Sequence, residues 1–130
     1  MRAIGITLIA AIAMISTPAR AANDTGEQLY TSLKRYVDSV ERQPVVPDEA
    51  KDFAMAQNIG YVLGVWDGIM IARVMAKKDT TCMPAGLSNV ALARTVLGHI
   101  DAKPGERSIG ATYVVANALI ESYPCLNDPK

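Results

Sequence analysis

The chain has 130 residues, of which 50% are hydrophobic and 20% charged, and its 13 basic residues balance its 13 acidic residues. This length and composition suit one globular domain. The absence of a basic run and of an aromatic stacking platform argues against nucleic-acid binding, and the balanced charge gives no reason to expect an anionic membrane as a partner.

The first 21 residues have the pattern of a secretory signal peptide. Arg2 provides a positive start, residues 4–15 are apolar, and residues 18–21 end in an A-x-A pattern. We expect cleavage after Ala21 and export to the periplasm, which leaves a mature domain of residues 22–130. A retained membrane anchor is the alternative, although the apolar run is short for a membrane span. Loss of the two signal-peptide arginines leaves 11 basic and 13 acidic residues, a net charge of −2.

The mature chain contains two cysteines, Cys82 and Cys125. In an exported protein a disulfide bond between them is the default expectation. Two unpaired thiols or a shared metal ion are the alternatives, and a metal site is poorly supported because His99 is the sole histidine. We therefore predict one disulfide and no metal.

Helical periodicity begins at residues 23–41, and we expect this first helix to be peripheral because its apolar stripe is thin. The stripe consists of Leu29, Leu33, Tyr36, Val37 and Val40. Residues 43–47 contain two prolines and break the helix, and Asp48 suits the N-cap of a long second helix over 49–78.

Two further helices follow the loop after residue 78. Ser88 suits the N-cap of the third helix, and Leu87 with Leu92 fits a hydrophobic staple around it. Lys103-Pro104-Gly105 is the next turn. We expect the last helix to run from about residue 106 to residue 123, with one apolar side. That side is predicted to carry Ile109, Tyr113, Ala116, Ile120 and Tyr123.

No alternating strand pattern competes with these helices. The sequence therefore predicts an all-α fold: a small single-domain bundle of about four helices around the long central one, with one disulfide. The second helix is apolar nearly all round, which favours a central position. Asp67 and Arg73 within its apolar run argue against the alternative that it spans a membrane.

Three glycines, Gly60, Gly64 and Gly68, stand four residues apart in this helix and form one ridge of bare backbone, which Asp67 borders. Each costs roughly 0.5–1 kcal/mol relative to alanine inside a helix, so close approach of another helix is expected there. Tight packing inside the monomer and a homodimer seam are the two interpretations of the ridge.

No arrangement typical of a catalytic centre is present. His99 lacks a motif partner for acid–base chemistry and is expected to be a polar residue at a helix end. Asp67 either bonds a neighbouring backbone group or tyrosine hydroxyl, or has an interface role. The chain lacks the common hydrolase, metalloprotease, phosphate-binding and dithiol motifs. We expect no enzyme activity, no catalytic residue and no cofactor.

Four segments together resemble a known family. They are G-Y-V-L-G-V-W-D-G at 60–68, C-M-P-A-G-L-S at 82–88, H-I-D-A-K-P-G-E-R at 99–107 and A-N-A-L-I-E-S-Y-P-C at 116–125. This combination resembles the Rap/Tai family of periplasmic immunity proteins, that is, resistance-associated proteins and type VI secretion amidase immunity proteins. The resemblance covers about residues 60–125.

The resemblance implies a helical fold with a structural disulfide. It also implies that the protein binds a peptidoglycan amidase effector delivered by type VI secretion, often as a homodimer, with a protruding loop that blocks the amidase active-site cleft. Two loops, 78–86 and 102–106, could serve. The candidate partner-binding residues in the first are Lys78, Asp79, Thr80, Thr81, Met83 and Pro84. The alternative function is a general periplasmic binding or stress-protective, chaperone-like protein without a cognate effector.

Overall fold

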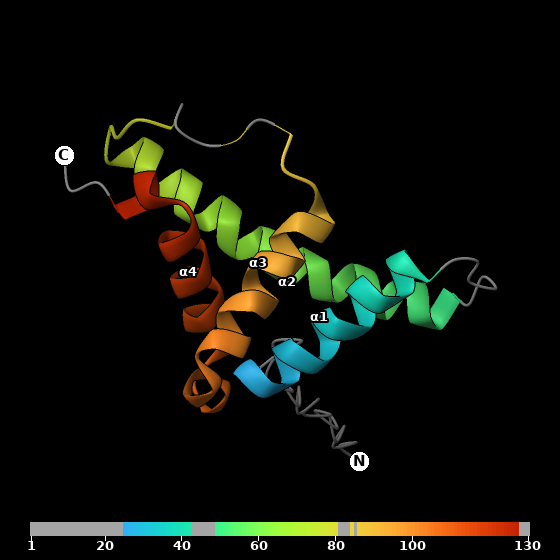
Figure 1. The fold of residues 1–130 in the computed structure, drawn as a ribbon. Coiled ribbons are helices and arrows are strands. Elements are labelled where there is room, and N and C mark those ends of the chain that lie inside the picture. The colour runs from blue at the N-terminus through green and yellow to red at the C-terminus, as the bar shows by residue number, and fades with distance from the viewer. Residues whose placement is uncertain (1–24, 43–48, 81–83, 85, 128–130) are drawn as a thin grey trace, which may run out of the picture.

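The computed structural model describes residues 25–42, 49–80, 84 and 86–127, and for residues 49–55 it describes the backbone alone. These residues form four α-helices and two short 3₁₀ helices, and none of them belongs to a strand. The elements are α1 (Gly26–Glu41), α2 (Glu49–Met75), α3 (Asn89–Ala102), η1 (Pro104–Ser108), α4 (Ala111–Ser122) and η2 (Pro124–Asn127). In Figure 1, α3 crosses α2, with α4 on one side and α1 on the other. The predicted all-α architecture is confirmed.

The first helix begins at Gly26 behind a capping box, in which the Thr25 hydroxyl accepts from the Gln28 N–H and the Gln28 side chain accepts from the Thr25 N–H. The prediction that this helix is peripheral is wrong. Leu29 and Leu33 are fully buried, and α1 packs against the three other α-helices and η1. The stripe is narrow, but Leu29, Leu33 and Val37 face the core on successive turns, and Val40 at its end is exposed.

Most of the buried apolar side chains come from the two C-terminal helices. They are Leu92, Ala93, Val96 and Ile100 in α3, and Ala111, Val114, Val115, Ala118 and Leu119 in α4. Among the described side chains of α2, the buried hydrophobic ones are Ile59 and Val62. The prediction that α2 occupies the centre of the fold is therefore wrong, because α3 and α4 supply most of the buried apolar side chains. With 27 residues α2 is about 40 Å long, which is longer than the helices it crosses, so its C-terminal end extends past the core.

The last helix differs from its prediction in both its start and its buried face. Residues 104–108 form η1, so Glu106 does not lie at the N-terminus of α4. The predicted inner residues Ile109 and Tyr113 are 38% and 70% exposed, whereas Val114 and Leu119 are fully buried. Because α4 is apolar on nearly every side, its periodicity does not select a face, and packing against α3 and α1 decides which side chains are covered.

The third helix starts as predicted. The Ser88 hydroxyl accepts from the Ala91 N–H at 3.2 Å. Leu92 is buried, and Leu87 packs against the core. The N-cap prediction is confirmed, because capping signals depend on residues within one helical turn.

The C-terminus of α2 has the hydrogen bonds of a Schellman motif: the Lys77 N–H donates to the Val74 carbonyl at 3.0 Å, and the Lys78 N–H donates to the Arg73 carbonyl at 2.9 Å. Lys77 has a φ of 54°, a conformation that favours glycine. We therefore expect Lys77→Gly to raise the free energy of unfolding by about 1 kcal/mol.

Urea denaturation followed by circular dichroism measures this change. Lys77→Ala is the control, since alanine keeps the Cβ that makes the left-handed conformation unfavourable. An equal gain in the alanine variant would show that the lysine charge, and not the backbone conformation, limits stability here.

Several predictions lie outside the described residues: the signal peptide, the break at 43–47, the Asp48 N-cap and the position of Cys82.

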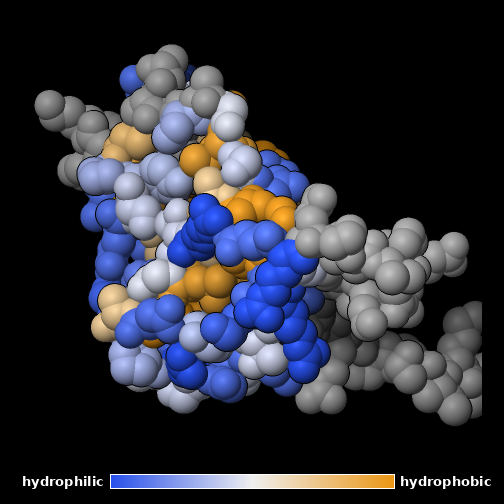
Figure 2. Space-filling model, turned by 45° about the vertical axis from the view of Figure 1, so that its right-hand side comes forward, coloured by the Kyte–Doolittle hydropathy of each residue, from blue (hydrophilic) through white to orange (hydrophobic). Residues whose placement is uncertain are grey.

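Within the described part of the chain, no helix combines the length and the apolar character needed to cross a lipid bilayer. On the face drawn in Figure 2, hydrophobic surface gathers in a central strip between hydrophilic margins.

Candidate binding groove

The glycine ridge of α2 is open to solvent. Gly60, Gly64 and Gly68 are all exposed, and a Cβ built on any of them meets no described atom within 4 Å. The interpretation that the ridge packs tightly inside the monomer is therefore wrong. Since three helix-interior glycines lower helix stability, an open ridge favours contact with another molecule.

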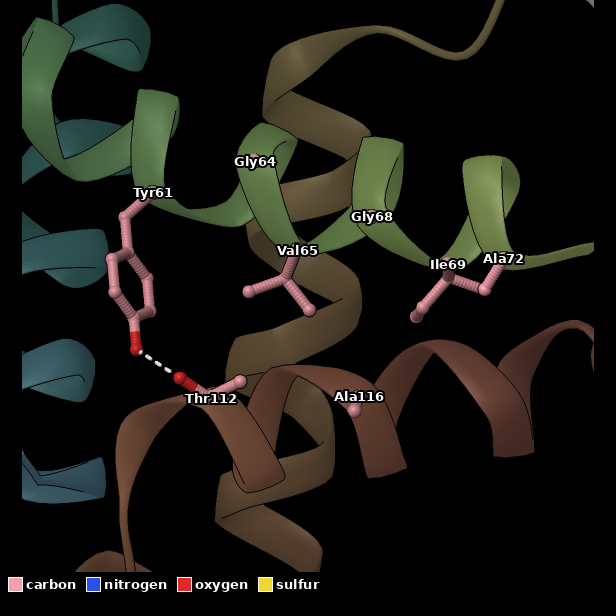
Figure 3. A pocket seen from close by; sticks show the side chains of 8 residues that line it. All are labelled: Tyr61, Gly64, Val65, Gly68, Ile69, Ala72, Thr112 and Ala116. Carbon is pink, nitrogen blue, oxygen red and sulfur yellow. Dashed lines mark hydrogen bonds between the residues drawn. The ribbon is translucent and has the colours of Figure 1, made fainter. Parts of the chain in front are cut away.

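A groove runs beside this ridge, between α2 and α4, with a volume of about 580 Å³. Its lining residues are Tyr61, Gly64, Val65, Gly68, Ile69, Ala72, Thr112 and Ala116. Figure 3 shows Val65 and Ile69 of α2 directed toward α4, and Ala116 on the facing side of α4. Glycine and alanine at half of the lining positions leave the groove unfilled by side chains.

One hydrogen bond spans the groove. The Tyr61 hydroxyl and the Thr112 Oγ1 lie 2.7 Å apart and join α2 to α4 at one end of the lining (Figure 3). The remaining lining side chains are apolar or absent. The groove therefore suits apolar groups along its length, and the two hydroxyls at its end bond to each other.

Exposed hydrophobic side chains continue along α2 past the groove. Ile71, Val74 and Met75 are 60%, 64% and 80% exposed. Ile71 and Met75 follow Gly64 and Gly68 at helical spacing, so they extend the same flank of the helix. Because large exposed apolar patches mark interaction sites, this end of α2 is a candidate binding surface.

Asp67 is exposed on this flank. Tyr61 lies on the same helix, and its hydroxyl pairs with Thr112 rather than with Asp67. An interface role for Asp67 requires an exposed side chain, and its exposure beside the ridge is consistent with that interpretation.

Arg73, which follows the groove-lining Ala72, is a buried residue with an exposure of 7%. Its guanidinium donates to the Asp79 carbonyl from Nη2 at 2.6 Å and from Nε at 3.2 Å, and to the Leu126 carbonyl from Nη1 at 3.1 Å. It thereby joins the end of α2, the start of the following loop and η2. The sequence signal for this role is an arginine inside an apolar helix, a position that also argues against a membrane span.

The candidate partner-binding loop starts beside the exposed end of α2. Asp79 and Pro84 are exposed, and Lys78 and Thr80 are partly buried. Thr81 and Met83 lie outside the described residues. Cys125 lies in η2, but Cys82 also falls outside the described part of the chain, so the disulfide stays a prediction.

His99 lies away from the groove. It is buried in the last turn of α3, and its Nε2 is 2.9 Å from the Glu106 Oε2. This hydrogen bond holds the pKa of Glu106 below the usual glutamate value, against the opposing effect of desolvation. His99 lies at a helix end as predicted, but no motif in the sequence indicated its glutamate partner.

The comparisons with known proteins give one match. The family described as Rap1a immunity proteins matches residues 25–125, which cover α1 to α4 and reach into η2. No curated protein matches the chain, and no solved structure matches it. Since the family match spans more than half of the sequence, this chain belongs to the family of Rap1a immunity proteins.

Proposed function

We propose that this protein is a periplasmic immunity protein that binds and inhibits a peptidoglycan amidase effector delivered by type VI secretion. The observation that carries the proposal is the family match over residues 25–125. Immunity proteins act by binding a partner effector, which implies an inhibitor rather than an enzyme. The open groove and the exposed end of α2 supply an apolar surface of the kind that protein partners cover.

The loop at 78–86 is our candidate for the segment that blocks the amidase cleft. Its first residues follow the exposed end of α2, and Arg73 fixes the Asp79 carbonyl with two hydrogen bonds. A loop whose root is held in place loses less conformational entropy on binding than one that is free. The proposed disulfide between Cys82 and Cys125 would tie the same loop to η2, to which Arg73 already connects it through Leu126.

The second loop candidate, residues 102–106, has a different anchorage. Its C-terminal half belongs to η1, where the Glu106 N–H donates to the Lys103 carbonyl at 2.9 Å. The Glu106 side chain pairs with His99. This segment would therefore present a rigid edge to a partner rather than an extended plug.

We place the proposed homodimer contact on the glycine ridge. Without side chains at Gly60, Gly64 and Gly68, two α2 helices could approach backbone to backbone, which side chains at these positions would prevent. Ile71 and Met75 on the same flank would then become buried. Association through α2 would leave the loop at 78–86 at the end of the contact, available to the effector.

The first experiment is a pull-down with oxidised protein of residues 22–130 against the secreted proteins of the host, read by mass spectrometry. We expect this pull-down to capture one cell-wall amidase in an amount equimolar with the immunity protein. The purified amidase should then lose its peptidoglycan hydrolysis in proportion to added immunity protein, reaching zero at equimolar concentration.

Capture of a stoichiometric effector without amidase activity would keep the immunity role and overturn the amidase target. Many substoichiometric clients would favour the chaperone-like alternative and overturn the inhibitor proposal. Denatured luciferase is a useful additional probe, since a chaperone-like protein would suppress its aggregation and a specific inhibitor would not.

A further inference from the structure

A second cavity continues the groove toward the C-terminal end of α2. It has a volume of about 280 Å³, and Ile69 and Ala72 line both the groove and this cavity. Its lining residues are Ile69, Ala72, Arg73, Ala76, Lys78 and Leu126. The two charged residues among them are both cations, and the others are apolar. This cavity, which we call the Arg73 pocket, therefore combines an apolar wall with positive charge.

Arg73 carries a positive charge that no carboxylate of the described residues neutralises. The residue is 7% exposed, and its hydrogen bonds go to the backbone carbonyls of Asp79 and Leu126. Isolated buried charges are unfavourable, so a buried cation normally has an anionic partner. Three more exposed arginines do pair with carboxylates, namely Arg42, Arg94 and Arg107. The buried arginine thus lacks the kind of partner that these exposed arginines have.

The contacts that Arg73 makes inside the chain require N–H donors but not a charge. Its acceptors are neutral carbonyls, and the negative end of the α2 dipole offsets part of the charge. A guanidinium has five N–H groups, and three of those of Arg73 are used in the observed hydrogen bonds. The remaining two are available to a further acceptor. A carboxylate would form charge-assisted hydrogen bonds there, which are roughly twice as strong as neutral ones.

The surroundings of the pocket are complementary to an acidic, partly apolar segment. Among the residues that the structure describes, no acidic side chain lines either the groove or the Arg73 pocket, so an incoming carboxylate would meet no like charge in the lining. Lys78 adds a second positive charge to the same cavity. The groove beside it offers Val65 and Ile69 to apolar side chains (Figure 3). Apolar contact along α2 and negative charge at its C-terminal end are therefore the matching chemistry.

We propose that the groove and the Arg73 pocket together bind one segment of the effector, in which apolar residues adjoin an aspartate or glutamate whose side chain bonds to Arg73. The identity of this partner rests on the proposed function. The pocket lies at the root of the loop at 78–86, because Arg73 holds the Asp79 carbonyl with two hydrogen bonds. An acidic side chain on the rim of the amidase cleft would thus be bound while the loop enters the cleft.

Two peptides test the proposal without the effector. Both consist of leucine and alanine, are acetylated and amidated, and differ in one residue, which is glutamate in one and glutamine in the other. Titration into the mature protein with ¹⁵N-labelled arginine is followed by nuclear magnetic resonance. At about 50 mM salt the glutamate peptide should bind roughly tenfold more tightly and should shift the Arg73 Nε–H resonance, and high salt should reduce this preference.

Three variants assign the preference to the pocket. Arg73→Gln keeps neutral donors and removes the charge, so it should bind both peptides equally. Lys78→Gln should weaken binding of the glutamate peptide roughly threefold, because Lys78 lines the pocket. Lys77→Gln is the matched control, since Lys77 is exposed and does not line the pocket, and it should keep the preference. If Arg73→Gln fails to fold, the two lysine variants and the Arg73 resonance of the unmodified protein decide.

Equal affinity for the two peptides in the unmodified protein would overturn the proposal, even if the protein inhibits an amidase. A preference for the glutamate peptide in a protein that captures no amidase would instead support the acidic-segment site and count against the amidase target. A preference that emerges only after deletion of residues 128–130 would show that the C-terminal segment of the chain itself occupies the pocket. A preference that emerges only with Asp67→Asn would show that a second copy occupies it. Either of these last two results would also overturn the proposal.

Discussion

Replacing Gly64 and Gly68 together by leucine is expected to lower affinity for the effector or the second copy roughly 100-fold and to leave the monomer folded. Both glycines are exposed, and added side chains meet no described atom within 4 Å, so the monomer has room for them. Leucine also favours a helix by roughly 0.5–1 kcal/mol per position relative to glycine. In a complex, however, the two side chains would fill the groove and hold the partner away from the backbone.

Two measurements distinguish whether the groove binds a second copy of the chain or the effector. Light scattering after size-exclusion chromatography reports the oligomeric state, and titration calorimetry against the captured effector reports its affinity. Loss of the dimer with retained effector binding would assign the ridge to the second copy. Loss of effector binding alone would assign it to the effector.

Gly98→Leu is the matched control for this experiment. Gly98 lies on α3, is exposed and has open space around its Cβ position, but it does not line the groove. We expect it to keep the oligomeric state and the affinity of the unmodified protein. If the double variant of Gly64 and Gly68 behaves like this control in both measurements, the groove is not the binding site.

Gly26→Ala is expected to lower the free energy of unfolding by about 2–3 kcal/mol. A Cβ on Gly26 would lie 2.6 Å from the Glu106 carbonyl oxygen and 3.0 Å from the Arg107 Cα. Both are backbone atoms, so no rotamer change can relieve the overlap. The start of α1 would have to move away from η1 and weaken the 2.9 Å hydrogen bond from the Gly26 N–H to the Ile109 carbonyl.

Urea denaturation of Gly26→Ala beside Gly64→Ala and Gly98→Ala measures this effect against the helix preference for alanine. The two control variants should be more stable than the unmodified protein by about 0.5–1 kcal/mol, because alanine replaces glycine in an open helix interior. A Gly26→Ala variant as stable as these controls would show that α1 and η1 can separate at little cost.

Local signals made the helices predictable. The Ser88 cap, the turn at Pro104 and the stop before Pro124 act within about one helical turn of chain, and all three coincide with boundaries of observed elements. The capping box at Thr25 has the same local character but was not predicted, and the expected first helix starts at residue 23 whereas α1 starts at Gly26. The extent of α4 was less accurate, because η1 has helical residues of its own that the periodicity merged with it.

The proposed binding groove was predictable in part. The spacing of Gly60, Gly64 and Gly68 pointed to the helix and the flank beside which the groove lies, because glycine in a helix interior is unfavourable unless something else requires it. The sequence could not show α4 beside them, with Thr112 and Ala116 completing the groove. Nor could it show that Arg73 reaches Leu126, a contact between residues 53 positions apart.

The amino-acid sequence by itself determined the all-α class, most helix boundaries and the likeness to immunity proteins, because caps, prolines and periodicity act over a few neighbouring residues. Only the tertiary structure decided which faces are covered. α4 is apolar on nearly all sides, so its contacts with other helices chose Val114 and Leu119 over Tyr113 for the core. The same long-range packing buried the thin stripe of α1, left the glycine ridge of α2 open and placed His99 beside Glu106.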